Sequence, residues 1–147
     1  MGQQKNDICG CGVHIDMDKD LQYQIFWNGG KGTNNKAEAM ALAGLLTFSC
    51  FLNIQSLLIC GDSKIIIDHV TGKNHIKKQH LVGWMNRITS LWGRMEGYTI
   101  QHINKAQNSQ DDILSKKGLL SQKGFWNMDV IIEAKTFSIQ KFSLPGT

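Results

Sequence analysis

The spacing of apolar residues in the first third of the chain predicts a β-hairpin followed by a helix. Two runs of strand-forming residues, Ile8 to Ile15 and Leu21 to Trp27, flank a polar turn and predict the hairpin. A glycine-rich loop then leads to Thr33 to Asn35, whose residue types cap helix N-termini. From Ala37 to Leu52 apolar residues recur at helical spacing, and many are small. We therefore expect a helix that lies close to a sheet.

The rest of the chain predicts a strand, two helices, a strand, a helix and two final strand-like runs. The first strand is continuously apolar, as in a parallel strand buried on both faces, and the second helix has a clear amphipathic pattern. In chain order the ranges are Ser56 to Cys60, Lys64 to Val70, His80 to Met95, Tyr98 to Ile103, Gln110 to Lys117, Met128 to Ala134 and Thr136 to Phe142. This order predicts an α/β fold with a mixed sheet.

Composition narrows the class of protein. A chain of 147 residues with 41% hydrophobic and 19% charged residues is typical of one globular domain, and the net charge of +4 mildly favours an anionic partner. The longest apolar stretch is too short to span a membrane, and residues 1–7 lack an apolar signal core. We expect an intracellular monomer with no membrane partner, in the nucleus or the cytoplasm. The four cysteines match no zinc spacing, so we expect buried thiols.

Three carboxylates suggest chemistry because each is expected at the end of an element. Glu38 lies near a helix start, Asp62 follows a strand, and Asp112 begins the last helix. Element ends of an open α/β sheet gather in one crevice, where carboxylate oxygens suit Mg²⁺. Each acid also has a structural alternative: Asn35 and Glu38 have capping-box spacing, and the other two carboxylates favour helix N-termini. For each acid considered alone, the structural role is favoured over metal binding.

Taken in order, the motifs around these acids resemble ribonuclease H type 1, especially its plant and retroelement branch. Thr33-Asn34-Asn35-Lys36-Ala37-Glu38 resembles the motif that opens the family's first helix, and Gly61-Asp62-Ser63 the one that ends its fourth strand. The family's later pattern is matched at His102, Ile103, Asn108, Asp112 and Leu114, but not at Lys105, Asp111 and Ser115. The resemblance covers roughly residues 8 to 120, and ordered motifs are more specific than any one alone.

The resemblance implies a three-layer ribonuclease H-like fold with a mixed five-stranded sheet over residues 1–122, followed by a C-terminal tail, residues 123–147. It also implies a reverse transcriptase-like endonuclease that hydrolyses RNA in RNA–DNA hybrids, with two Mg²⁺ or Mn²⁺ ions as cofactor. Glu38, Asp62 and Asp112 would be the catalytic metal ligands. His102 would be a structural residue at the end of the fifth strand, with Asn108 near the site.

The sequence departs from the family at its start. The family's first strand carries Asp-Gly, and here that position falls near Met1-Gly2, so we expect a chain truncated before the first catalytic aspartate and lacking the central strand. Three functions stay open: a hydrolase, a non-catalytic remnant that binds nucleic acid or protein, and, less favoured, an α/β regulatory fold with no nucleic-acid role. We also consider that the run Met128 to Ala134 fills the vacant centre and offers Asp129 or Glu133 to the metals.

Further residues are candidates for holding nucleic acid. In the family, polar residues at the positions of Asn34 and Asn35 approach the hybrid's minor groove, where 2′-hydroxyls distinguish RNA. Lys73, Lys77 and Lys78 form a basic loop where some members carry a substrate-binding extension, although a solvated loop is about equally favoured. Trp84 and Trp92 share an apolar stripe, so we assign both to the core and not to base stacking, which is the less favoured alternative.

Overall fold

The computed structural model describes residues 2–5, 7–61, 63–74, 78–103 and 109–142, which form four helices and seven strands. In chain order these are β1 (Gly2–Lys5), β2 (Ile8–Asp18), β3 (Leu21–Lys31), α1 (Asn34–Phe51), β4 (Ser56–Gly61), α2 (Lys64–Val70), α3 (Gln79–Trp92), β5 (Gly97–His102), α4 (Ser109–Leu119), β6 (Trp126–Ile132) and β7 (Lys135–Phe142). Each predicted helix and strand is present at its expected place, and β1 is an additional strand.

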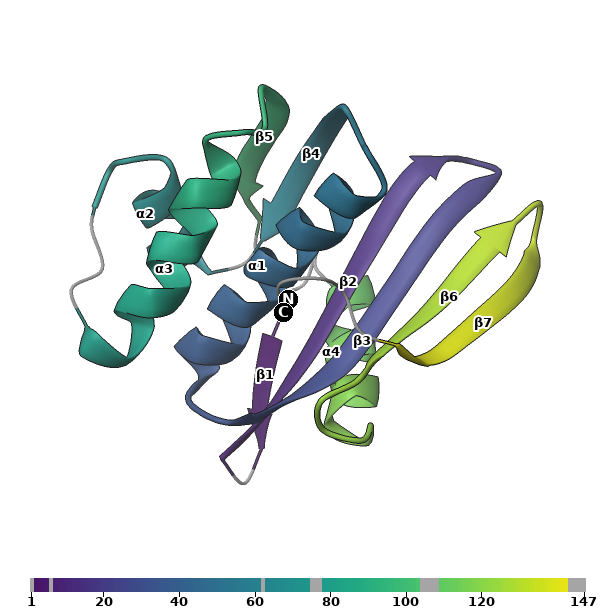
Figure 1. The fold of residues 1–147 in the computed structure, drawn as a ribbon, viewed down its shortest axis with the longest axis horizontal. Coiled ribbons are helices and arrows are strands. Elements are labelled where there is room, and N and C mark those ends of the chain that lie inside the picture. Colours follow the sequence, from purple (N-terminus) through teal and green to yellow (C-terminus); the bar gives the residue numbers. More distant parts are fainter. Residues whose placement is uncertain (1, 6, 62, 75–77, 104–108, 143–147) are drawn as a thin grey trace.

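The strands form a large antiparallel sheet and a small parallel one (Figure 1). The large sheet has the order β1-β2-β3-β6-β7, and each neighbouring pair is antiparallel. The small sheet pairs β4 with β5 in parallel, from Ser56 opposite Gly97 to Gly61 opposite His102. The Ile103 amide continues this pairing by donating to the Gly61 carbonyl at 2.8 Å. The predicted α/β class, with parallel and antiparallel strands, is confirmed.

The expectation that the first strand is missing needs correction. Gly2–Lys5 forms β1, which pairs with β2 in the register Gly2 opposite Cys11 and Lys5 opposite Ile8. The pairing uses backbone groups, which polar residues supply as well as apolar ones, so Gln3, Gln4 and Lys5 gave no alternating signal. The prediction of a single mixed five-stranded sheet also needs correction. Among the strands that the structure describes, β4 bonds only to β5, so the strands form two sheets.

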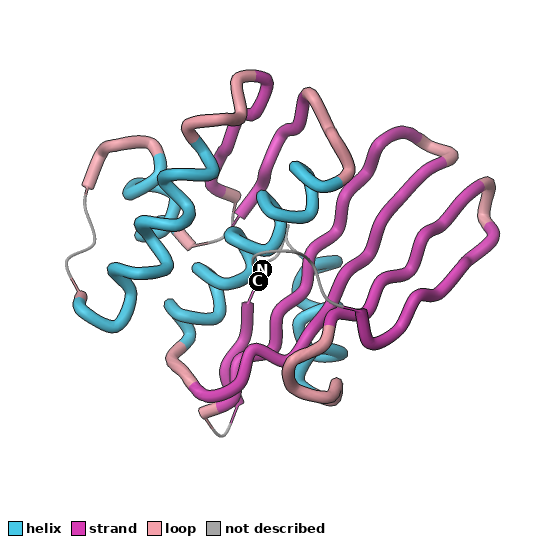
Figure 2. The backbone as a smooth tube through the Cα atoms, viewed as in Figure 1, coloured by secondary structure: helices cyan, strands magenta, loops and turns pink. Residues whose placement is uncertain are grey.

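Helices cover both faces of the large sheet (Figure 2). Along β2, Cys9 and Cys11 point toward α1, where their thiols lie 3.7 Å from backbone oxygens at its start. The alternate residues Gly10 and Gly12 face α4, and a Cβ on either would lie 2.3 to 2.4 Å from that helix. The alternation of thiol and glycine therefore places one helix on each side of β2.

Helix α1 forms the middle of the core. Small side chains make up much of its buried surface, as predicted, and α3 packs against its outer side. Trp84 and Trp92 of α3 are half-buried and pack against this core, which agrees with their assignment. The largest fully buried side chains come from β2, β3, all four helices and no loop: Phe48, Ile15, Ile25, Leu42, Leu46, Ile66, Leu81, Met85, Ile88 and Leu114.

The prediction that β4 is buried on both faces is wrong. Ile59 is buried, whereas Leu58, on the opposite face, is 57% exposed. The reason is that α4 covers β1, β2 and β3 but makes no comparable contact with β4. A continuously apolar run does not reveal whether a helix covers its second face.

The residues after α4 extend the large sheet at its far side from β1. β6 pairs with β3 from Leu21 opposite Ile132 to Trp27 opposite Trp126, and those two indoles stack at 4.2 Å. Two strands separate β6 from β1, a distance of roughly 14 Å at the usual strand spacing. The hypothesis that Met128 to Ala134 fills the centre and presents Asp129 or Glu133 to metals is therefore wrong. The division of the chain at residues 122 and 123 stays a prediction.

Helix α2 contacts β5 and α3 and carries a buried acid, Asp68. Asp68 is buried and accepts a hydrogen bond from Lys64 Nζ at 2.8 Å, one helical turn earlier. This bond lowers the pKa of the Asp68 carboxyl, and the positive charges of Lys64, Lys73 and His102 lower it further. The helix ends as predicted, with Ser63 at its N-cap and Gly72 at a φ of 82° after its C-cap.

In the described part of the chain, no helix is both long and apolar enough to cross a membrane.

Changing Ala134 to Gly should stabilise the β6–β7 hairpin. Glu133 and Ala134 form its two-residue turn with φ angles of 48° and 66°, as in a type I′ turn, where glycine is favoured. Each residue with a Cβ costs roughly 1–2 kcal/mol in this conformation. We expect Ala134→Gly to slow amide exchange of β6 by about fivefold, corresponding to about 1 kcal/mol. Ala134→Val is the matched control and should accelerate it; equal rates in all three proteins would contradict the turn.

Changing Asp68 to Asn should destabilise the protein near neutral pH and much less in acid. Because the folded pKa lies below the ordinary value of 3.8, the ionised carboxylate stabilises the fold above that pH. This contribution disappears as pH falls through the lowered pKa. Urea unfolding at several pH values should show the gap between Asp68→Asn and the parent narrowing in acid. The exposed Asp18, changed to Asn, is the control; a gap that does not depend on pH would contradict the ion pair.

Candidate active site and nucleic-acid interface

Glu38 is the candidate ligand whose surroundings the structure describes most fully. It lies in the second turn of α1, is only 9% exposed, and accepts a hydrogen bond at Oε1 from the backbone amide of Gly2, at 2.8 Å. Thr33 is the N-cap of α1, and its hydroxyl accepts from the Lys36 amide at 3.2 Å. The capping box of Asn35 and Glu38, considered as an alternative, is therefore not formed. The Glu38 carboxylate is directed toward β1 instead.

The contact between β1 and α1 is made backbone to backbone at Gly2. A Cβ on Gly2 would lie 2.3 Å from the carbonyl carbon of Ala37 and 2.6 Å from the amide nitrogen of Glu38. A larger residue would therefore push the strand away from the helix. Glycine at this position thus brings the amide within reach of the Glu38 carboxylate.

The cysteines around this contact are structural. Cys9 and Cys11 are buried as predicted, whereas Cys50 is exposed and Cys60 is half-buried, which corrects the expectation for those two; all four are free thiols. Burial raises the pKa of Cys9, an effect that Lys36 partly offsets, and it raises the pKa of Cys11 more strongly. Both thiols are therefore protonated at neutral pH, and neither is a reactive nucleophile.

The other predicted ligands are only partly described. Asp112 lies in α4, as expected, but its side chain is not described, and Asp62 and Asn108 lie outside the described residues. His102 is exposed at the last position of β5, as the resemblance implied, and its charge acts on Asp68 of α2. Among the described residues, no three His, Cys, Asp or Glu side chains converge. The convergence of the three acids stays a prediction.

The candidate nucleic-acid residues lie on two surfaces. Asn34 is exposed at the start of α1, and Asn35 beside it is half-buried. Lys73 and Lys78 are exposed on either side of the segment between α2 and α3, while Lys77 lies outside the described residues. Both surfaces are accessible to a polyanion, and the structure does not test whether one binds.

The sequence reading missed several cationic and aromatic residues. Lys36 spans the start of α1, where its Nζ donates to the Lys31 carbonyl at 2.8 Å. Arg87 and Lys123 line a groove together with Trp27 and Trp126. The TNNKAE motif already held a signal for Lys36. No local signal links the other residues, because they come from three separate parts of the chain.

Solved structures with a similar fold include ribonucleases H1 and a viral protease-reverse transcriptase. LC11 ribonuclease H1, solved with an RNA/DNA hybrid, has a TM-score of 0.67 at 22% identity, over 80% of this chain and 91% of that one. Ribonuclease H1 of the archaeon Halobacterium salinarum has a TM-score of 0.64 at 19% identity, over 80% and 92%. The protease-reverse transcriptase of prototype foamy virus has a TM-score of 0.52 at 17% identity, over 79% of this chain and 21% of that one. These likenesses show the fold.

Sequence comparison supplies the family. No curated protein matches the chain in sequence. The model of the reverse transcriptase-like family, however, matches residues 2–118, from β1 to the last turn of α4. Membership of the plant and retroelement branch, and truncation before the first aspartate, stay predictions. The chain belongs to the reverse transcriptase-like family and is a ribonuclease H-like domain.

Proposed function

We propose that this domain binds RNA–DNA hybrid and hydrolyses its RNA strand at a site built around Glu38. The observation that carries the proposal is the buried Glu38 carboxylate, held by the Gly2 amide at the contact of α1 with β1. A buried acid in a fixed orientation is typical of a functional site. The fold and the family support the reaction, and the LC11 ribonuclease H1 with this fold was solved with an RNA/DNA hybrid.

The donor chemistry of the proposed site fits Mg²⁺ or Mn²⁺. Glu38, Asp62 and Asp112 would hold the ions, and carboxylate oxygens are the hard ligands that these cations prefer. Bound divalent ions supply activation of water and stabilisation of charge on the phosphate. Hydrolysis adds one water across a phosphodiester bond, so one P–O bond breaks and leaves a phosphate and a hydroxyl end. The Gly2 amide fixes one oxygen of Glu38, so this carboxylate needs little reorganisation.

Polar and basic residues of two surfaces would recognise the substrate. Asn34 at the start of α1 would approach the hybrid's minor groove, with Asn35 beside it. Lys73, Lys77 and Lys78 would contact phosphates, which sets position on the duplex but not sequence. His102 and Asn108 would support the site from the end of β5 and the start of α4.

A non-catalytic binding module is the second candidate. One observation favours it: the family's Asp-Gly pair is matched here by Met1-Gly2, and methionine has no carboxylate. Such a module would bind hybrid, or a protein, through the same surfaces without cutting RNA.

Cleavage of a labelled RNA strand in RNA–DNA hybrid, with Mg²⁺, tests the proposal. Glu38→Gln keeps the acceptor for the Gly2 amide but removes the charge, so we expect a folded protein whose cleavage rate is at least about 100-fold lower. Asp62→Asn and Asp112→Asn should act alike. Glu96→Gln, which removes an exposed carboxylate, is the control and should cut like the parent. Cleavage that survives Glu38→Gln would refute the assignment of this residue.

A variant with Asp at position 1, carried behind an added methionine, separates the two candidates. Cleavage by the parent supports the hydrolase. Cleavage by the Met1→Asp variant alone would mean that the parent, with Met1, is a binding module built on an intact scaffold. Absence of cleavage and of hybrid binding in both folded proteins would refute the proposal.

Loss of the basic side chains should weaken hybrid binding in a salt-dependent way. Each lysine that neutralises one phosphate contributes about 0.9 to the slope of log affinity against log salt. We expect Lys73→Gln and Lys78→Gln each to lower that slope by about one and the affinity by several-fold. Lys19→Gln, in the exposed turn between β2 and β3, is the matched control. Unchanged slopes in both test variants would show that the loop is only solvated.

A further inference from the structure

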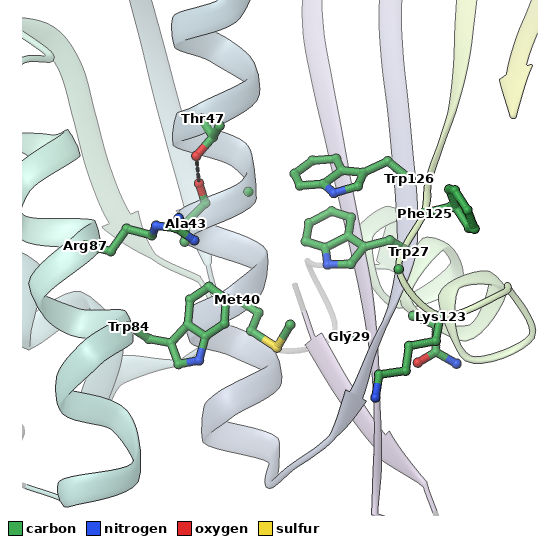
Figure 3. A pocket seen from close by; sticks show the side chains of 13 residues that line it. Trp27, Gly29, Met40, Ala43, Thr47, Trp84, Arg87, Lys123, Phe125 and Trp126 are labelled. Carbon is green, nitrogen blue, oxygen red and sulfur yellow. Dashed lines mark hydrogen bonds between the residues drawn. The ribbon is translucent and has the colours of Figure 1, made fainter. Parts of the chain in front are cut away.

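A groove of about 250 Å³ runs along α1, between Trp84 of α3 and the pair of Trp27 and Trp126 (Figure 3). Met40, Ala43, Gly44 and Thr47 of α1 form its floor, at steps of three and four residues. Glu38 precedes Met40 by two residues, which places it on nearly the opposite side of the helix. The groove is therefore separate from the proposed catalytic carboxylate.

The floor contains a glycine, Gly44, because the tryptophan pair that forms one wall lies against it. Trp27 and Trp126 stack at 4.2 Å with 12° between their planes, and a Cβ on Gly44 would lie 2.5 Å from the Trp27 ring. Both indoles are at most 7% exposed, so they build the wall and leave little ring surface for a ligand. The Thr47 hydroxyl donates to the Ala43 carbonyl at 2.8 Å, so it is directed at the helix backbone.

Accessible aromatic surface comes from the opposite wall and from the rim. Trp84 of α3 is half-buried, and Figure 3 shows it across Met40 from the Trp27 and Trp126 pair. Phe125, also half-buried, lies on the outer side of that pair. The groove therefore offers an indole face and a thioether to a flat ligand.

The charged residues of the groove are cations. Arg87 lies with its Cζ 5.7 Å from the Trp84 ring centroid, and Lys123 extends from the other wall (Figure 3). None of the described residues lining the groove is acidic. The two cations complement a ligand that has an aromatic ring with an anionic group on each side. An uncharged or acidic peptide segment matches this arrangement of charges less well.

We propose that the groove binds one nucleotide of a single-stranded nucleic acid. The base stacks on Trp84 above the small residues of the floor, and Arg87 and Lys123 contact the flanking phosphates. Sites for single strands combine aromatic faces with basic side chains in this way, and stacking accepts any base. The volume is below the roughly 300 to 1,000 Å³ of pockets for drug-sized ligands and suits one base.

The proposed single-strand site is inferred from the residues of the groove and is independent of the proposed hydrolysis. Part of one wall lies outside residues 2–118, the segment that matches the family: Lys123, Gly124, Phe125 and Trp126. A domain that acts on a hybrid meets single strands wherever the hybrid ends. The groove would hold such a strand whether or not the domain cuts RNA.

Fluorescence anisotropy with a labelled thymidine decamer tests the proposal, with divalent ions chelated so that the carboxylate site contributes nothing. A decamer with abasic sugars carries the same phosphates and should bind much more weakly. We expect Trp84→Ala to weaken decamer binding roughly tenfold and Trp84→Phe to retain most of it. Arg87→Gln and Lys123→Gln should each lower the salt slope by about 0.7. Arg94→Gln and Lys135→Gln, exposed cations outside the groove, should match the parent.

Three results would overturn the proposal. The first is equal affinity for the normal and abasic decamers, or for Trp84→Ala and the parent, when circular dichroism shows both proteins folded. The second is binding of thymidine monophosphate as tight as that of the decamer, which would make a free nucleotide the ligand. The third is an apolar dye that Trp84→Ala no longer binds and that the decamer does not displace, which would indicate an apolar protein segment in the groove.

Discussion

The structure depends on two places where a helix backbone meets a strand backbone with no side chain between them. On one face of β2, Gly10 and Gly12 admit α4; on the other face of the sheet, Gly2 of β1 meets the start of α1 at Ala37. Dispersion and exclusion of water act at full strength only at such close approach. The position of Glu38 follows from it, because the Gly2 amide reaches the carboxylate only when β1 lies against α1. The orientation of the Glu38 carboxylate therefore depends on the absence of a side chain at Gly2.

Periodic apolar residues made the helices and most strands predictable, and long-range pairing set the rest. The runs that became α1 and α3 carry their own helical period, and β2 and β3 their own turn. β1 was missed because its residues after Gly2 are polar and give no alternating signal, while its pairing with β2 uses backbone groups. The place of β6 beside β3 also has no local signal, since it depends on Trp27 and Trp126 stacking across about a hundred residues of chain. For β4, the exposure of Leu58 depends on how far α4 reaches.

For the candidate site, too, a local motif predicted which residue to consider, and a tertiary contact determined its surroundings. The TNNKAE motif was sufficient to select Glu38, yet the spacing of Asn35 and Glu38 suited a capping box equally well. Thr33 takes the capping role, and the partner of Glu38 lies 36 residues away in β1. These contacts exclude the capping box at Asn35 and Glu38, and no property of the local sequence predicts them. The groove on the other side of α1 was hidden for the same reason, because its walls come from β3, α3 and the segment before β6.

Helix α1 connects these two features because it carries small residues where it meets the large sheet. Ala37 lets β1 approach at the start of the helix, and about two turns later Gly44 makes room for the Trp27 and Trp126 pair. Alanine is the best helix former, so Ala39, Ala41 and Ala43 keep the helix intact while it gives up side-chain volume. A Cβ at position 44 would lie 2.5 Å from the Trp27 ring and would push α1 away from the sheet to which β1 also belongs. The close approach of α1 to this sheet therefore depends on Gly44 as well as on Gly2.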